Sequence, residues 1–144
     1  MKVIEIDSSN CIGCMSCVLA CSLAKTKALS YKNAVMKIVK DEPKEICQIF
    51  CCSNCSQRNC IKACHFGAIN MDENYNIPII DYEKCTSCGL CARNCAYGII
   101  KIESGSRKVY KCDFCGGSPS CALSCIPQAI KVKDTDMEGG ETND

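Results

Sequence analysis

Cysteines are the residues of this sequence that are best suited to chemistry. The chain has 18 of them among 144 residues, far above ordinary usage in globular proteins. Sixteen form a fourfold internal repeat, which is the main organising feature of the sequence. The four blocks are Cys11, Cys14, Cys17 and Cys21; Cys52, Cys55, Cys60 and Cys64; Cys85, Cys88, Cys91 and Cys95; and Cys112, Cys115, Cys121 and Cys125.

The spacing within the blocks is typical of iron–sulfur proteins. The first and third blocks read C-x2-C-x2-C-x3-C, and the second and fourth have a longer gap before their third cysteine. Three cysteines on a tight loop can bind three irons of a cubane cluster, and a cysteine from elsewhere must then bind the fourth. In two-cluster bacterial ferredoxins, the fourth cysteine of each run binds the neighbouring cluster. Four complete blocks therefore predict four [4Fe–4S] clusters.

Zinc sites and disulfides are the alternatives at this cysteine density. Zinc ribbons use two cysteine pairs separated by a longer loop, and the third cysteine of a compact block has no role in them. A disulfide scaffold is expected in secreted chains, but Glu5 and Asp7 interrupt the segment where a signal peptide would be apolar. No stretch has the roughly 20 apolar residues that cross a bilayer. The sequence favours a cytoplasmic iron–sulfur protein.

Three further residues could take part in metal binding. Cys47 and Cys51 lie outside the repeat, and Cys51 could replace Cys52 as a ligand. The favoured interpretation is that both are buried or free thiols. His65 directly follows Cys64, and imidazole can ligate clusters, but with every thiolate present we expect it to be a bystander.

Charge and motifs exclude several functions. The chain has 17 basic and 16 acidic residues, which gives no basic footprint for nucleic acid. Four oxidised clusters would shift the formal charge of +1 to about −7, because each thiolate-ligated cluster carries about −2. Dinucleotide-binding, P-loop and H-E-x-x-H motifs are absent, and one histidine supports no Ser/His/Asp set. We therefore expect electron transfer without a catalytic site.

The elements that position the cysteines are expected to be short. Apolar, β-branched runs predict strands at residues 3–6, 77–80, 99–102 and 129–132. Residues 35–39 are either a further strand, which is favoured, or an irregular connection from the first block to the second. Short helices are expected after the third cysteine of a block, as over residues 18–27 in the first block. Residues 134–144 hold five acids and no base and predict a disordered acidic tail. With no Trp and three Phe, metal–thiolate bonds are expected to supply much of the folding free energy.

The order of the motifs resembles the four-cluster electron-transfer subunits of the dimethyl sulfoxide reductase and formate dehydrogenase type. Residues 111–121, KCDFCGGSPSC, are similar to the small iron–sulfur subunits of tungsten aldehyde oxidoreductases and the related benzoyl-CoA reductases. Carbon monoxide dehydrogenase-associated ferredoxins share the layout. These families usually place Pro after the fourth cysteine of a block, where this chain has Ser22, His65, Ala96 and Ile126.

The resemblance implies an α+β fold of two bacterial-ferredoxin-like modules, one nested in the other. Residues 1–46 and 97–133 would form the outer module, and residues 47–96 the inner one. Spacing alone leaves the pairing of the blocks open. The resemblance implies a first quartet of Cys11, Cys14, Cys17 and Cys125; a second of Cys21, Cys112, Cys115 and Cys121; a third of Cys52, Cys55, Cys60 and Cys95; and a fourth of Cys64, Cys85, Cys88 and Cys91.

The function that the resemblance implies is conduction of single electrons between a catalytic oxidoreductase subunit and a second, flavin- or ferredoxin-type redox partner. A tungsten or molybdenum aldehyde oxidoreductase is the favoured catalytic partner, and carbon monoxide dehydrogenase is the next. Neither nucleic acid nor direct membrane insertion is expected. Two alternatives are a free polyferredoxin-type carrier and a cluster-based catalytic protein with an open iron site.

Overall fold

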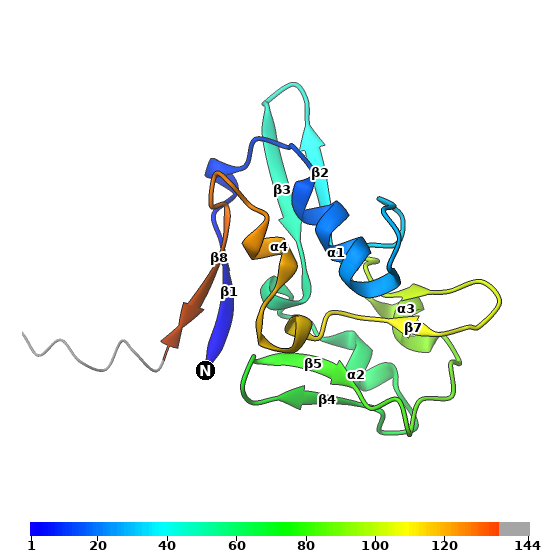
Figure 1. The fold of residues 1–144 in the computed structure, drawn as a ribbon. Helices are drawn as coiled ribbons and strands as arrows, with labels where there is room; N and C mark the ends of the chain where they lie inside the picture. Colours follow the sequence, from blue (N-terminus) through cyan, green and yellow to red (C-terminus); the bar gives the residue numbers. More distant parts are fainter. Residues whose placement is uncertain (136–144) are drawn as a thin grey trace, which may run out of the picture.

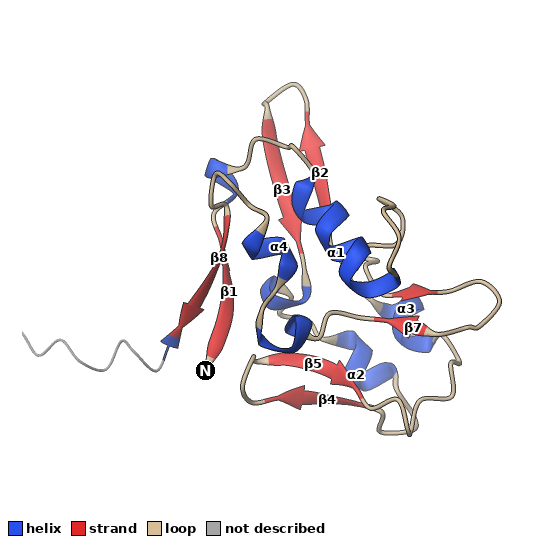
Figure 2. Cartoon of the chain, in the orientation of Figure 1, coloured by secondary structure: helices blue, strands red, loops and turns tan. Residues whose placement is uncertain are grey.

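The computed structural model describes residues 1–135, which form an α+β fold of four two-stranded antiparallel sheets and four short α-helices (Figures 1 and 2). The α+β prediction is confirmed. In the described part of the chain, no helix is long and apolar enough to cross a membrane. The α-helices are α1 (Ser16–Thr26), α2 (Asn59–Ala63), α3 (Leu90–Asn94) and α4 (Ser120–Leu123). The strands are β1 (Lys2–Ile6), β2 (Lys37–Asp41), β3 (Ile46–Phe50), β4 (Ile69–Asp72), β5 (Ile77–Ile80), β6 (Lys101–Ile102), β7 (Val109–Tyr110) and β8 (Ile130–Asp134).

Strands β1 and β8 join the two ends of the described chain. They pair antiparallel with Lys2 opposite Asp134 and Ile6 opposite Ile130, and Figure 1 shows the blue start of the chain beside the orange-red end. The Thr135 amide also donates to the Met1 carbonyl at 2.9 Å. The predicted tail therefore starts too early, because Asp134 belongs to β8. The rest of that prediction, residues 136–144, lies outside the described residues.

Helices pack in pairs, and each pair joins two distant cysteine blocks. Helix α1 packs against α4, and α2 packs against α3. Ser22, which directly follows the fourth cysteine of the first block, is completely buried in α1. Its hydroxyl donates to the Ala28 carbonyl at 2.6 Å and accepts from the Ser30 amide at 3.0 Å. The buried hydroxyl thus holds the loop that follows the helix.

The strand predictions hold for the ends of the chain and for β5, and they fail where apolar residues serve the core instead. Ile99 and Ile100 are buried outside any strand, so only the last two residues of the predicted 99–102 strand form β6. Strand β2 begins at Lys37, after the buried Val35 and Met36. Strands β3 and β4 were not predicted, because polar residues interrupt their apolar pattern. Strand β7 was not predicted because it is only two residues long.

Two apolar cores of unequal size support the fold. The larger contains 15 buried residues drawn from both ends and the middle of the chain, with Phe114 fully buried. The Phe114 ring stacks on Tyr75 with the ring centroids 4.5 Å apart. The smaller core contains five buried residues, namely Cys60, Ile69, Cys91, Ile100 and Val109.

Candidate metal centres

Three cavities are each lined by four cysteines, and each set coincides with a quartet that the resemblance implied. The space between the lining side chains is about 280 Å³ at the first quartet and about 330 Å³ at the third and fourth, including the part open to solvent. The other lining atoms are mainly apolar, from residues such as Ile38 and Ile130 at the first quartet and Ile69 and Val109 at the fourth. Four thiols in an apolar cavity are a donor set that suits a [4Fe–4S] cluster.

The second quartet is brought together by the packing of α1 on α4. Burial raises the pKa of Cys21 to about 11, and the neighbouring Cys115 contributes to the rise. Burial also raises the pKa of Cys121, with Cys51, Cys21 and Cys115 as further causes. These mutual effects show that cysteines from both ends of the chain lie close together. Assignment of ligands to clusters stays a prediction.

The loops that hold the first cysteines turn through residues with left-handed backbone. Met15 (φ 65°), Arg58 (φ 50°) and Gly89 (φ 81°) each directly precede the first residue of a helix and stand two residues before the third cysteine of a block. This conformation is costly for residues other than glycine. At Gly13 the positive φ of +70° itself favours glycine. An added Cβ would also lie 3.1 Å from Cys47 Sγ, whereas the flexible Lys40 side chain, with Cε at 2.7 Å, can move aside.

Each helix connects two neighbouring quartets. The third and fourth cysteines of every block are four residues apart. Both lie within the helix only in α1, where this spacing puts them on one face about one turn apart. In the other blocks the fourth cysteine lies just after the end of the helix. Cys17 accordingly lines the first cavity, while Cys21 lies beside Cys115 of the second quartet. The helix pair α1 and α4 with its two quartets forms one half of the molecule, and the pair α2 and α3 forms the other. In this second half, Cys60 lines the cavity of the third quartet and Cys64 that of the fourth.

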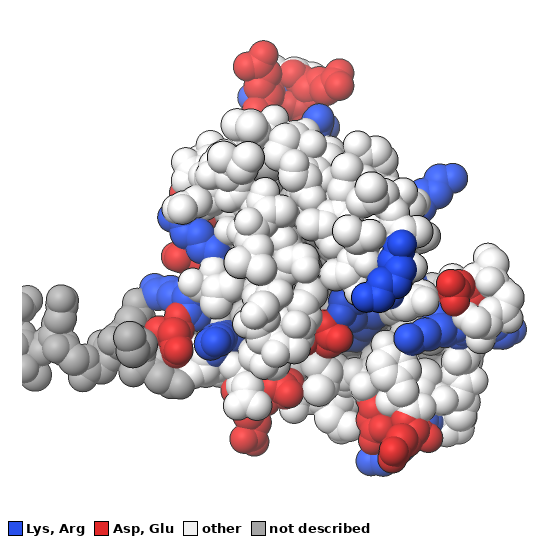
Figure 3. All heavy atoms as spheres, viewed as in Figure 1, with Lys and Arg blue, Asp and Glu red and all other residues white. Residues whose placement is uncertain are grey.

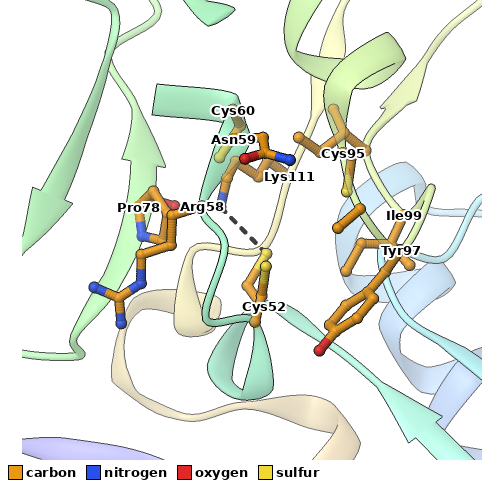
Figure 4. A pocket seen from close by; sticks show the side chains of 12 residues that line it. Cys52, Arg58, Asn59, Cys60, Pro78, Cys95, Tyr97, Ile99 and Lys111 are labelled. Atoms are coloured by element: carbon orange, nitrogen blue, oxygen red, sulfur yellow. Dashed lines mark hydrogen bonds between the residues drawn. The ribbon is translucent and has the colours of Figure 1, made fainter. Parts of the chain in front are cut away.

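The second and third quartets meet at the junction of the two halves. A hydrogen bond with the Cys112 side chain and the nearby Lys111 ammonium lower the pKa of Cys52, against the opposing effect of burial. Lys111 itself lines the third cavity, and Figure 4 shows its side chain directed at Cys52. The quartets therefore follow one another in the order first, second, third and fourth.

Solvent reaches the quartets at the two ends of this order. Cys14 of the first quartet and Cys88 of the fourth are exposed, whereas every other cysteine of the repeat is half-buried or buried.

Burial raises the pKa of Cys17 to about 12. Such thiols are protonated in a cluster-free chain at neutral pH, so binding of iron must release protons.

A lysine near the second quartet is paired with a carboxylate. Lys25 on α1 forms an ion pair with Asp113, which lies between Cys112 and Cys115 in the chain. The Lys25 side chain is only 10% exposed. Its positive charge at this quartet is therefore largely balanced by the carboxylate.

The cysteines outside the repeat are buried beside the quartets. Cys47 is buried next to Cys11. The pKa of Cys11 is raised mainly by its own burial, and Cys47 contributes to the rise. Cys51 lies near Cys121, whereas Cys52 lines the third cavity with the other members of its quartet. His65 is exposed. Among residues 1–135, no three Cys, His, Asp or Glu side chains converge closely enough to hold a single metal ion.

The sequence did not reveal that Lys111 is part of the site. A lysine directly before a cysteine gives no local signal that its side chain is buried or that it reaches a different block. The one available hint was that Lys111 follows two strand-forming residues, Val109 and Tyr110. A side chain next to a strand can be buried.

Family models define the class of protein. Residues 51–99 match a 4Fe-4S dicluster domain and residues 2–23 match a 4Fe-4S binding domain. The chain is thus a 4Fe–4S protein, and its 18 cysteines suffice for four clusters.

Curated relatives define the family. The polyferredoxin-like subunit of the aliphatic sulfonate oxidoreductase of Pyrococcus furiosus is 30% identical over 85% of this chain and 70% of that protein. The beta subunit of the NADH-dependent phenylglyoxylate dehydrogenase of Aromatoleum evansii is 32% identical over 90% of this chain, and the iron–sulfur subunit of formate dehydrogenase-O of Escherichia coli is 30% identical over 87%. This chain belongs to the family of ferredoxin-type 4Fe–4S electron-transfer subunits. It spans only 30% and 50% of the length of the last two relatives.

A solved structure shares the fold. One chain of the BamBC active-site complex of benzoyl coenzyme A reductase, in complex with benzoyl-CoA, aligns with a TM-score of 0.52 and 23% identity. The alignment covers 97% of this chain and 87% of that chain. At this identity the likeness is one of fold.

Proposed function

We propose that this protein conducts single electrons through four [4Fe–4S] clusters between a catalytic oxidoreductase subunit and a second redox partner. Each cluster would be held by one of the four quartets, which divide between an outer module (residues 1–46 and 97–133) and an inner module (residues 47–96). A cluster with four thiolate ligands has no open position for substrate and only gains or loses electrons.

The serial order of the quartets is the observation that carries this proposal. Helices α1 and α4 join the first quartet to the second, the contact of Cys52 with Cys112 joins the second to the third, and α2 and α3 join the third to the fourth. The exposed members, Cys14 and Cys88, belong to the first and last quartets. Such an arrangement suits entry of electrons at one end and exit at the other.

The surface near the first quartet is suited to contact with a protein partner. Ile12 and Ile126, which directly follow Cys11 and Cys125, are 72% and 91% exposed. Figure 3 shows that the face over α1 and α4 is largely uncharged, while acidic side chains gather at the turn between β2 and β3. Exposed apolar side chains close together often mark interaction sites.

For the catalytic partner we propose a tungsten or molybdenum enzyme of the aldehyde oxidoreductase type, with carbon monoxide dehydrogenase as the next candidate. The names of two similar proteins support a partner of the oxidoreductase class, since they describe subunits of an aliphatic sulfonate oxidoreductase and of a formate dehydrogenase. The second partner would be a flavin or ferredoxin protein.

Anaerobic purification of the tagged protein from its host tests this proposal. We expect it to elute with a catalytic subunit and to contain about 16 iron and 16 acid-labile sulfide per chain. Tungsten or molybdenum in the complex would support the favoured partner, and their absence would count against it. Elution alone at 15.7 kDa with all clusters present would instead indicate a free carrier.

A further inference from the structure

Lys111 is a buried cation at the junction between the two halves of the molecule. The residue is only 3% exposed. Its Nζ donates a hydrogen bond to Cys52 Sγ at 3.2 Å and another to the Pro78 carbonyl. Figure 4 shows the ammonium in the cavity wall that also includes Cys60 and Cys95. The side chain thus connects the backbone beside Cys112, of the second quartet, to the third quartet.

No carboxylate balances this charge in the described part of the chain. The ion pairs of residues 1–135 include Lys25 with Asp113 and Lys84 with Asp81, but none with Lys111. A buried ammonium without a counter-charge is costly. The negative charge that compensates it must therefore come from the third quartet, whose sulfur atom is one of its two hydrogen-bond acceptors.

We infer that Lys111 raises the reduction potential of the cluster in the third cavity. Without a cation in this cavity, the cluster would have a lower potential. This inference rests on the ligand set proposed above. Reduction adds one electron and so one negative charge, which a neighbouring ammonium stabilises. Hydrogen bonds to ligand sulfurs and burial are the levers that set cluster potentials. Here the apolar Ile99 and Ile100 in the cavity wall lower the potential, and Lys111 opposes them.

As a consequence, the third cluster, in the middle of the series, is reduced more readily than its neighbours. At the second quartet, Lys25 is already neutralised by Asp113, so its effect on the cluster is weaker. At the first quartet, Lys40 approaches Gly13 but is exposed to solvent, and water screens its charge. The third cluster alone has a buried cation that lacks a carboxylate partner within the described residues.

The first test is Lys111→Met, which removes the charge and keeps an unbranched side chain. We expect the equilibrium constant for reduction of one cluster to fall tenfold or more, which is about 59 mV for a one-electron couple. Lys111→Arg retains the charge and should stay closer to the wild-type value. Lys40→Met is the matched exposed control, with a smaller shift. The readout is a redox titration followed by electron paramagnetic resonance on anaerobic protein that retains its iron.

Cys95→Ala identifies the affected cluster, because it removes a predicted ligand of the third quartet only. The spectral component missing from this variant should be the component that moves in Lys111→Met. Movement of a different component, or of none with all four clusters retained, would overturn the role of Lys111. Retention of all clusters in Cys95→Ala would contradict the ligand set instead, a failure that the two readouts distinguish.

A measurement on the wild-type protein keeps the inference testable if Lys111→Met does not assemble. Protein labelled with ¹⁵N only at lysine Nζ should show an electron spin-echo modulation from a lysine nitrogen on the reduced third cluster. The coupling should be missing in Lys111→Arg and in Cys95→Ala. If no lysine nitrogen couples to the cluster that Cys95→Ala removes, Lys111 does not act on it.

Discussion

The two cores of the molecule support their cysteines in different ways. The larger core has 15 buried residues, of which four are cysteines, and the pairing of β1 with β8 closes it. The smaller core has five, of which two are cysteines, and helices of five residues pack around it. The first can keep apolar packing when metal is absent. The second has only three buried residues besides Cys60 and Cys91, so we infer that its structure depends on the clusters of the third and fourth quartets.

Removal of iron should reveal the largest difference in stability between the two cores. After anaerobic chelation, we expect amides of α2 and α3 to exchange with solvent at nearly unprotected rates, while β1 and β8 keep partial protection. Small metal domains lose their folding free energy with the metal, and local stability follows apolar packing. Hydrogen exchange with mass spectrometry measures this. Equal loss of protection in both regions would show that the larger core also depends on iron.

Two exposed ligands provide a matched pair for the next test. Cys14→Ala and Cys88→Ala each remove a thiol that contributes little packing, and each should cost one cluster, or about four of 16 irons. We expect Cys88→Ala to increase exchange throughout α2 and α3, and Cys14→Ala to have a milder effect on α1. Iron analysis and hydrogen exchange report the two effects. A larger disturbance in Cys14→Ala would reverse the proposed dependence.

Substitution of the central aromatic side chain tests the packing of the larger core without touching a ligand. Phe114 is fully buried and stacks on Tyr75, so Phe114→Ala should lower the free energy of unfolding by about 3 to 5 kcal/mol. Tyr31→Ala, at a side chain that is 58% exposed, should change it by about 0.5 kcal/mol or less. Anaerobic denaturant titrations of the holoproteins compare them. A small effect at Phe114 would mean that clusters also dominate the stability of this half.

The smallest effect is expected at a thiol outside the repeat. Cys47→Ala should keep four clusters, because the first cavity already has four cysteines without it. The loss of one buried sulfur should cost about 1 kcal/mol. Iron and sulfide analysis provides the count, with Cys55→Ala as the variant that should lose a cluster. Loss of a cluster from Cys47→Ala would show that Cys47 is a ligand at the first cavity and that the predicted first quartet is wrong.

Local patterns in the sequence were sufficient for several elements. Strand β5 occupies residues 77–80 as its apolar run predicts, and α1 (Ser16–Thr26) covers most of the helix expected over residues 18–27. The pattern failed at Val35, Met36, Ile99 and Ile100, which are buried outside strands. An apolar run shows that residues need burial but does not show whether a strand or an irregular segment of the core provides it.

The sequence by itself determined the kind of cofactor and the number of clusters, because a block of cysteines within about 14 residues carries its ligand spacing locally. Only the tertiary structure brought distant blocks together, as with Cys17 and Cys125 around one cavity. It also placed the Lys111 ammonium on the sulfur of Cys52, 59 residues away along the chain. Such contacts depend on how helices and strands from separate segments pack, and this packing is a property of the whole fold.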